Sequence, residues 1–211
     1  DSWVHMQEPE LATAKAKDLV RMAVAKVLRL SPLKEELLTI AQRAMVVGGG
    51  VAGMAAALAL SRQGYPTVIV ERDSVLGGQA RHLYKTAKGD AIEARLGRLI
   101  EQVQADPCIS VLLNARLRNV EGFVGNFKST VATGDTETTI DHGVTVIASG
   151  AQESLPTEYL FGQDERVITG LELDRRLKTG DRRLAQARTA VFIQCVGSRE
   201  PERPYCSRIC C

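Results

Sequence analysis

Four of the chain's five cysteines lie near its C-terminal end, at Cys195, Cys206, Cys210 and Cys211. Four thiolates make a complete ligand set for a tetrahedral metal ion or an iron–sulfur cluster. Zinc is not favoured, because zinc sites usually draw on paired CxxC motifs, which this chain lacks. A disulfide between Cys210 and Cys211 would be strained, since adjacent Cα atoms lie only about 3.8 Å apart. The thiols therefore predict an iron–sulfur cluster, with zinc binding and thiol redox chemistry as open alternatives.

A second group of residues has the spacing of a phosphate-binding turn. Gly48, Gly50 and Gly53 form GxGxxG between an apolar stretch and a run of small residues. In that context the first glycine allows a tight turn, the second lets backbone approach a pyrophosphate, and the third lets helix and strand pack closely. The following helix would offer unpaired N–H groups to the phosphates. Glu71 ends the next apolar stretch, where a carboxylate accepts ribose hydroxyls and repels a 2′-phosphate, so FAD or NAD is predicted rather than NADP.

Three further features favour FAD over NAD. Residues 76–79, LGGQ, follow the second apolar stretch, where flavoproteins often carry another glycine pair near the cofactor. A β-meander is predicted between the halves of the sheet, and residues 148–150, ASG, are small enough for close backbone approach to a dinucleotide. This arrangement resembles the two-dinucleotide-domain flavoprotein reductases, the thioredoxin reductase and glutathione reductase group. In that group the adenine lies near a meander strand that corresponds here to residues 115–117.

The elements that position these residues follow from hydrophobic patterning. Helical periodicity predicts helices over residues 10–30 and 89–104, and Ser31-Pro32 could cap a second short helix. Residues 110–139 alternate as antiparallel strands do, with a turn at Gly134-Asp135. Continuously apolar stretches predict strands buried on both faces of a parallel sheet. These stretches cover residues 45–47, 67–70, 143–151 and 189–194.

The predicted fold class is α/β, a Rossmann-like FAD-binding fold of the thioredoxin-reductase-like kind, with a β-meander and an N-terminal helical segment. Four parts are expected along the chain. They are an N-terminal helical lead (1–43), the FAD-binding domain (44–152), a connection carrying one helix (153–188) and the start of a second nucleotide-domain-like unit with the cysteines (189–211).

Composition narrows the function classes. The 211 residues carry 27 basic and 25 acidic side chains, for a net charge of +2, which does not favour nucleic-acid binding. No apolar run approaches the roughly 18 residues of a membrane span, and no secretory signal opens the sequence. Clustered cysteines indicate a reducing compartment, so a cytoplasmic protein is expected. Because there is no initiator Met, the chain is expected to be a piece of a longer protein.

Four sequence segments together resemble the A-subunit family of heterodisulfide reductases, along nearly the whole chain. They are SWVH, VVGGGVAGMAAALALSRQGYPTVIVERDSVLGGQ, VEGFVGNF and FIQCVGSR with YCSRICC. The resemblance implies a subunit with FAD and 4Fe–4S clusters in a soluble complex. Its flavin would relay or split electrons between ferredoxin or hydrogenase-type donors and a disulfide-reducing partner subunit.

The resemblance also implies residue roles, with none of them catalytic. The four C-terminal cysteines would ligate one 4Fe–4S cluster. The FAD site would comprise Gly48, Gly50, Val51, Ala52, Gly53, Glu71, Arg72, Gly77, Gly78, Gln79, Leu117, Ala148, Ser149 and Gly150.

Other interpretations remain open at the level of sequence. One is a pyridine-nucleotide-dependent disulfide reductase of the thioredoxin reductase group, but only Gly197 remains where its second glycine loop is expected. Others are a subunit of a quinone-interacting complex and a zinc-holding scaffold with structural FAD. His82, His142 and Cys108 are expected to be structural. The arginines at positions 199, 203 and 208 are expected to form an exposed basic loop.

Overall fold

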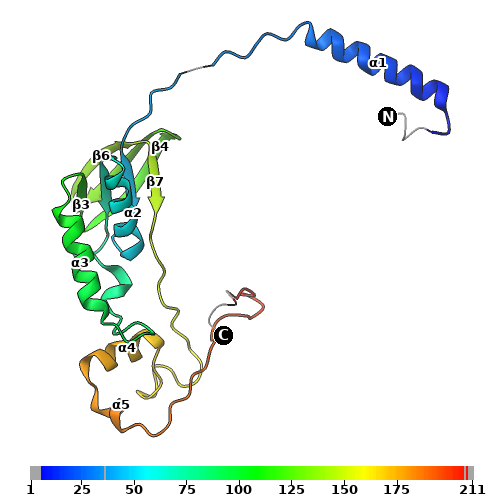
Figure 1. Cartoon of the computed structure of the whole chain (residues 1–211). Coiled ribbons are helices and arrows are strands. Elements are labelled where there is room, and N and C mark those ends of the chain that lie inside the picture. The colour runs from blue at the N-terminus through cyan, green and yellow to red at the C-terminus, as the bar shows by residue number, and fades with distance from the viewer. Residues whose placement is uncertain (1–5, 36, 207, 209–211) are drawn as a thin grey trace. The chain divides into compact units, whose positions relative to one another are not determined.

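The structure, a computed structural model, describes residues 6–35, 37–206 and 208 of the chain. The chain divides into two compact units, residues 1–38 and 39–211, and each is described by itself. Figure 1 labels their helices and strands along the chain. Among the described residues, no helix has both the length and the apolar character that crossing a bilayer requires.

The first unit contains one long helix, α1 (Pro9–Val27). Pro9 stands in its first turn, where a missing N–H leaves no hydrogen bond unmade. This helix confirms the one predicted over residues 10–30. Its apolar side chains are largely exposed, as Val20 (62%) and Val24 (54%) illustrate.

The short helix predicted after Ser31-Pro32 is wrong. Residues 31–35 and 37–43 form neither helix nor strand. Leu33 and Leu37 are each 98% exposed. No apolar contact therefore supplies the stabilisation that so short a helix needs in water, where helix nucleation is unfavourable.

A four-stranded parallel sheet forms the centre of the second unit. Its strands, in spatial order, are β3 (Ile109–Leu112), β2 (Thr67–Val70), β1 (Ala44–Val47) and β7 (Val144–Ile147). All three pairings are parallel. The sheet confirms the strands predicted at residues 45–47 and 67–70, and the predicted strand 143–151 is realised in its first half.

The two faces of the sheet are buried by different layers, because side chains along a strand alternate between its faces. On one face, Val46 and Ile69 pack with Met54 in a cluster that α2 (Val51–Arg62) and α3 (Ile92–Ala105) complete. These helices confirm the small-residue helix after the glycine turn and the helix predicted before Ser110.

The other face is covered by the predicted meander. It consists of β4 (Ala115–Phe123), β5 (Asn126–Thr133) and β6 (Thr136–His142), paired antiparallel in that order. Met45 and Val70 pack there against Val131 and Ile140. The turn predicted at Gly134-Asp135 joins β5 to β6, as expected for a glycine with a φ of 58°.

The start of the alternating region belongs to the parallel sheet rather than to the meander. Asn114 has a φ of 52°, a left-handed backbone conformation that asparagine tolerates. The chain turns there, so β3 ends before the turn and β4 begins after it.

The C-terminal part differs from expectation in two ways. The connection carries two helices instead of one, α4 (Gly170–Thr179) and α5 (Arg182–Gln186), because Gly180 ends the first with a φ of 69° and the Asp181 side chain caps the second. The strand predicted at residues 189–194 is wrong. Val191 and Phe192 are 80% and 68% exposed, and a strand does not persist without a neighbour to pair with.

His142 has the structural role expected of it. It is fully buried at the end of β6, and its Nδ1 lies 3.1 Å from the carbonyl oxygen of Val144, while Nε2 lies 2.8 Å from Ser129 Oγ. Because a carbonyl only accepts hydrogen bonds, Nδ1 carries the proton and Nε2 accepts from the hydroxyl. Burial lowers the pKa of His142 below its ordinary value.

This pKa shift makes stability depend on pH in a defined direction. The unfolded chain takes up a proton at the ordinary pKa of 6.5, before the folded chain does. The free energy of unfolding should therefore fall as pH drops below 6.5. His142→Gln should lose that part of the pH dependence, measured by urea unfolding at pH 7.5 and 5.5. The exposed His82, replaced by Gln, is the control; equal pH dependence in both variants would contradict the assignment.

Candidate functional site: a dinucleotide cradle

The turn between β1 and α2 has the geometry that the predicted glycine roles require. Gly48 has a φ of 112°, a conformation open essentially to glycine alone, and a Cβ there would overlap the carbonyl of Ala148. A Cβ on Gly53 would overlap the carbonyl oxygen of Gly48. The turn and the close contact of α2 with the strand therefore both depend on glycine.

Gly50 differs from these two glycines. Its φ of −74° and ψ of −177° are accessible to any residue, and a Cβ there would meet nothing within 4 Å. It is the N-cap of α2 and no side chain caps the helix, so the first-turn amides keep their capacity to bind an anion. Neither folding nor packing of the described residues calls for glycine at this position. A ligand held against the backbone does, which is the cradle expected for a pyrophosphate.

Glu71 lies beside this turn at the end of β2 and is only 5% exposed. Its Oε2 accepts a hydrogen bond from the Gly49 N–H at 2.5 Å, and its Oε1 accepts one from the Asp73 N–H at 2.8 Å. Each carboxylate oxygen can accept a second bond. The carboxylate therefore supports the glycine turn and still has capacity for ribose hydroxyls.

Gly49 is a site residue that the GxGxxG spacing does not single out. A Cβ on it would lie 2.5 Å from Leu76 Cδ2 and 2.9 Å from Glu71 Oε2. Its N–H bonds to Glu71, and its carbonyl accepts from the Gly77 N–H at 2.8 Å. The signal in the sequence is the uninterrupted triplet Gly48–Gly50.

The structure brings the second glycine pair directly against the turn. Gly77 forms a bridge with Gly50, and a Cβ on Gly78 would lie 3.2 Å from the Gly50 Cα. Gln79 reaches the segment after β7, where its Nε2 donates to the carbonyl of Ala151 at 3.2 Å. Three predicted segments, distant in sequence, therefore meet around Gly50.

The remaining predicted residues lie around these segments. Ala148 continues the ladder beyond β7, since its N–H donates to Val47 at 2.8 Å, and the exposed Ser149 and Gly150 follow it. Arg72 is exposed and lies 3.9 Å from an Asp73 carboxylate oxygen. Leu117 on β4 packs on the cluster beneath the sheet.

The cysteine site is only partly visible. Cys195 and Cys206 are free and half-buried, while Cys210 and Cys211 lie outside the described residues. The Arg208 N–H donates to Cys206 Sγ at 3.3 Å. No group of three or more His, Cys, Asp or Glu side chains in the described part of the chain is arranged to hold a metal ion. Cluster binding therefore stays a prediction.

Three other expectations concern single residues. Arg199, Arg203 and Arg208 are exposed, as predicted for a basic loop. Cys108 precedes β3 as predicted but is exposed, and its N–H bonds to Asp106.

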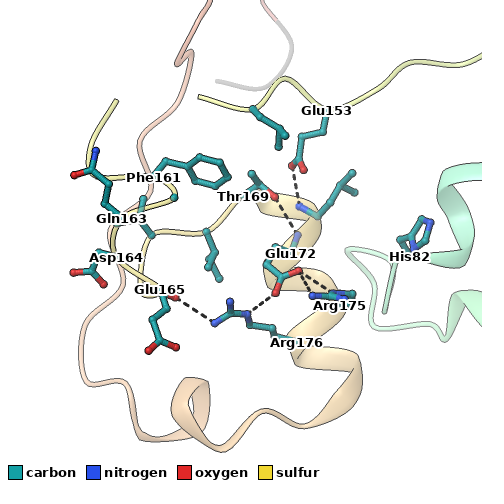
Figure 2. Close-up of a pocket in the computed structure, with 15 residues that line it drawn as sticks. His82, Glu153, Phe161, Gln163, Asp164, Glu165, Thr169, Glu172, Arg175 and Arg176 are labelled. Atoms are coloured by element: carbon teal, nitrogen blue, oxygen red, sulfur yellow. Dashed lines mark hydrogen bonds and ion pairs between the residues drawn. The ribbon is translucent and has the colours of Figure 1, made fainter. Parts of the chain in front are cut away.

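A pocket of about 600 Å³ lies elsewhere, among residues 153–176 and His82. Figure 2 shows that its charged side chains point at one another: Glu172 accepts from Arg175 at 2.8 Å and from Arg176 at 2.7 Å. These hydrogen bonds, that from Arg175 first, hold the pKa of Glu172 at about 2. The pocket is thus a satisfied charge network that stabilises α4, and the described residues that line it include no orphaned buried polar group to mark a ligand site.

Comparisons with known proteins agree with this geometry. Residues 42–192 match the family described as pyridine nucleotide-disulphide oxidoreductase. The A subunit of the H(2):CoB-CoM heterodisulfide,ferredoxin reductase of Methanothermobacter marburgensis is 30% identical over 302 aligned residues, which cover 100% of this chain and 46% of that protein. The iron-sulfur A 2 subunit of the CoB–CoM heterodisulfide reductase of Methanopyrus kandleri gives the same values, 30%, 100% and 46%, over 301 residues. This chain thus spans about half the length of the curated relatives it matches.

Among solved structures, the L-proline dehydrogenase of P. horikoshii superposes with a TM-score of 0.48 at 23% identity. The superposition covers 60% of this chain and 26% of that one.

Proposed function

The chain belongs to the pyridine nucleotide-disulphide oxidoreductase family, and we propose that it is the FAD-binding part of an electron-transfer subunit of the heterodisulfide reductase A type. The observation that carries this proposal is the open cradle at Gly50, where backbone geometry and packing would accept a side chain and a bound pyrophosphate would not. Similarity to reductase A subunits along the whole chain supports the same conclusion.

The residues would hold the dinucleotide at three places. The amides of Val51–Gly53 at the start of α2 receive the pyrophosphate, and Glu71 accepts the ribose hydroxyls. Arg72 and Leu117 are assigned to the adenosine end. The backbone of residues 77–79 and 148–150 borders the flavin end. When bound, FAD supplies the redox chemistry, accepting an electron pair and releasing single electrons, while the chain supplies position and electrostatics.

A single 4Fe–4S cluster is proposed on Cys195, Cys206, Cys210 and Cys211. The donor set is that of such clusters. The N–H of Arg208 on Cys206 Sγ supports the assignment, because a hydrogen bond to sulfur favours the thiolate and tunes the cluster's potential. The name of the Methanopyrus kandleri relative, which calls it an iron-sulfur subunit, points the same way.

The partners follow from the relatives' names and are proposals for this chain. The other subunits of a heterodisulfide reductase-type complex would carry out disulfide reduction. Ferredoxin or a hydrogenase-type donor would supply or receive electrons, in keeping with the ferredoxin and H(2) in the name of the Methanothermobacter marburgensis relative. The cytoplasm is the proposed compartment.

The test is a stepwise reductive titration of the intact protein, purified without oxygen and followed by visible absorption and electron paramagnetic resonance. We expect one reducible flavin and at least one reducible cluster, with iron and sulfide in equal amounts. Thiols that titrate without iron, together with flavin reduction by NADH or NADPH, would support the disulfide reductase alternative instead. Bound zinc with a non-reducible flavin would support the scaffold.

Replacing Glu71 by glutamine tests the ribose end of the site. The amide has lost the charge and one acceptor, so we expect affinity for FAD to fall about tenfold, as for loss of a hydrogen bond to a charged group. The measurement is isothermal titration of the flavin-free protein with FAD. Glu101→Gln on the exposed side of α3 is the matched control, and a Glu71→Gln variant as tight as this control would exclude the ribose role.

A further inference from the structure

The Gly77-Gly78 pair forms one wall of the proposed phosphate cradle but has little conformational stiffness of its own. Both residues have a positive φ, 114° and 51°. Glycines in this region have more accessible backbone conformations than other residues. The wall therefore needs an external contact to stay against Gly50.

Arg81 provides that contact from the end of the same short turn, η1 (Gly78–Arg81). Its aliphatic stem lies over Gly77, since a Cβ on Gly77 would be 2.9 Å from Arg81 Cγ. Its Nε donates to the Gly78 carbonyl at 3.4 Å. Its side chain is 31% exposed, so the contact is partly shielded from water.

The guanidinium also ties the pair to the end of β2. Arg81 Nη2 lies 3.3 Å from Asp73 Oδ2. The Asp73 N–H in turn donates to Glu71 Oε1, whose partner oxygen holds Gly49. A continuous set of contacts therefore runs from the ribose-facing carboxylate, through Asp73 and Arg81, to the second glycine pair.

We propose that Arg81 is a positioning residue for the dinucleotide: it fixes the Gly77-Gly78 wall against Gly50 and couples that wall to Glu71. The inference rests on the proposed flavin site. Arg81 acts through the backbone it holds, so its removal loosens the cradle without unfolding the domain. An ion pair this exposed contributes little to global stability.

The experiment compares Arg81→Ala, Arg81→Lys and the control Arg98→Ala in the intact protein. Arg98 is an exposed arginine on α3, for which no hydrogen bond or ion pair is found among the described residues. We expect Arg81→Ala to raise the dissociation constant for FAD about tenfold, mostly through faster release, as is usual for local changes in a binding site. The lysine variant, which keeps the pairing with Asp73, should recover part of the loss. Melting temperatures should stay within a few degrees of wild type.

A second readout needs no cofactor. In flavin-free protein, hydrogen exchange at the Gly77 amide, which is bonded to Gly49, should accelerate in Arg81→Ala and stay unchanged in Arg98→Ala. Unchanged exchange together with unchanged FAD affinity would overturn the role of Arg81 alone. Faster exchange in a protein whose wild type binds no FAD would keep Arg81 as the clamp of this loop but overturn both the proposed function and the dinucleotide role. A large fall in melting temperature would show a purely structural residue.

Discussion

Replacement of Gly50 by valine is expected to weaken FAD binding by about 100-fold or more, which corresponds to roughly 2.7 kcal/mol, while the domain stays folded. The backbone at Gly50 lies in a region open to branched residues, and a new Cβ would meet nothing within 4 Å. The loss of a good N-cap should cost only about 1 kcal/mol of stability. The side chain would project into the space that the pyrophosphate requires, so binding suffers far more than folding.

Two other glycines give this prediction its controls. Gly97 lies within α3 with nothing within 4 Å of a Cβ, so Gly97→Ala should stabilise the domain by about 0.5–1 kcal/mol and leave FAD binding alone. Gly53→Ala should impair folding itself, because its Cβ would overlap the Gly48 carbonyl. The measurements are thermal unfolding and fluorescence titration with FAD. A Gly50→Val protein that binds FAD like wild type would show that the phosphates lie elsewhere.

Replacement of Cys206 by serine is expected to remove one entire 4Fe–4S cluster while flavin content is unchanged. A serine hydroxyl is a poor substitute for thiolate, the ligand that holds such clusters. The Arg208 N–H that now bonds to Cys206 Sγ would lose its sulfur acceptor. Iron and sulfide analysis of anaerobically purified protein, with electron paramagnetic resonance of the reduced state, measures the loss.

Cys108→Ser is the matched control for that substitution. Cys108 is an exposed free thiol ahead of β3, far in sequence from the C-terminal cysteines, so iron, sulfide and flavin should all match wild type. Retention of every cluster in Cys206→Ser would remove this cysteine from the ligand set. Simultaneous loss of flavin and iron would indicate instead that the substitution unfolds the protein.

The parts of the fold that sequence predicted are those in which local chemistry decides. Gly48 must be glycine because of its positive φ. The alternation of Met45 and Val46 between the two faces of the sheet follows from strand geometry alone, and a continuously apolar stretch signals burial on both faces. Glu71 could be placed from its distance along the chain, since a β-α-β unit has a nearly constant length.

The wrong expectations concern structure that depends on distant partners. Residues 189–194 are as apolar as β1, yet no strand forms, because pairing depends on a neighbour that sequence pattern does not reveal. The helix expected after Ser31-Pro32 failed for a similar reason. The two helices of residues 170–186 carried local signals that a single-helix interpretation overlooked, namely the helix-ending Gly180 and the capping Asp181.

Within the candidate site, the glycine roles could be anticipated, but the contacts between segments could not. The bridge from Gly77 to Gly50 and the reach of Gln79 to Ala151 join residues far apart in the chain. The link from Arg81 to Asp73 arises because the second glycine pair folds back toward β2. Such contacts follow from the packed arrangement, which is why the positioning role of Arg81 has no signature in sequence.

The most direct test of the central claim is a cofactor count on the intact protein purified without oxygen. The protein would be denatured, its released dinucleotide identified by chromatography, and the amount compared with protein concentration. A cradle of this geometry is expected to yield close to one FAD per chain and no NADP. A protein that releases no FAD, and that takes up none when FAD is added, would contradict the account.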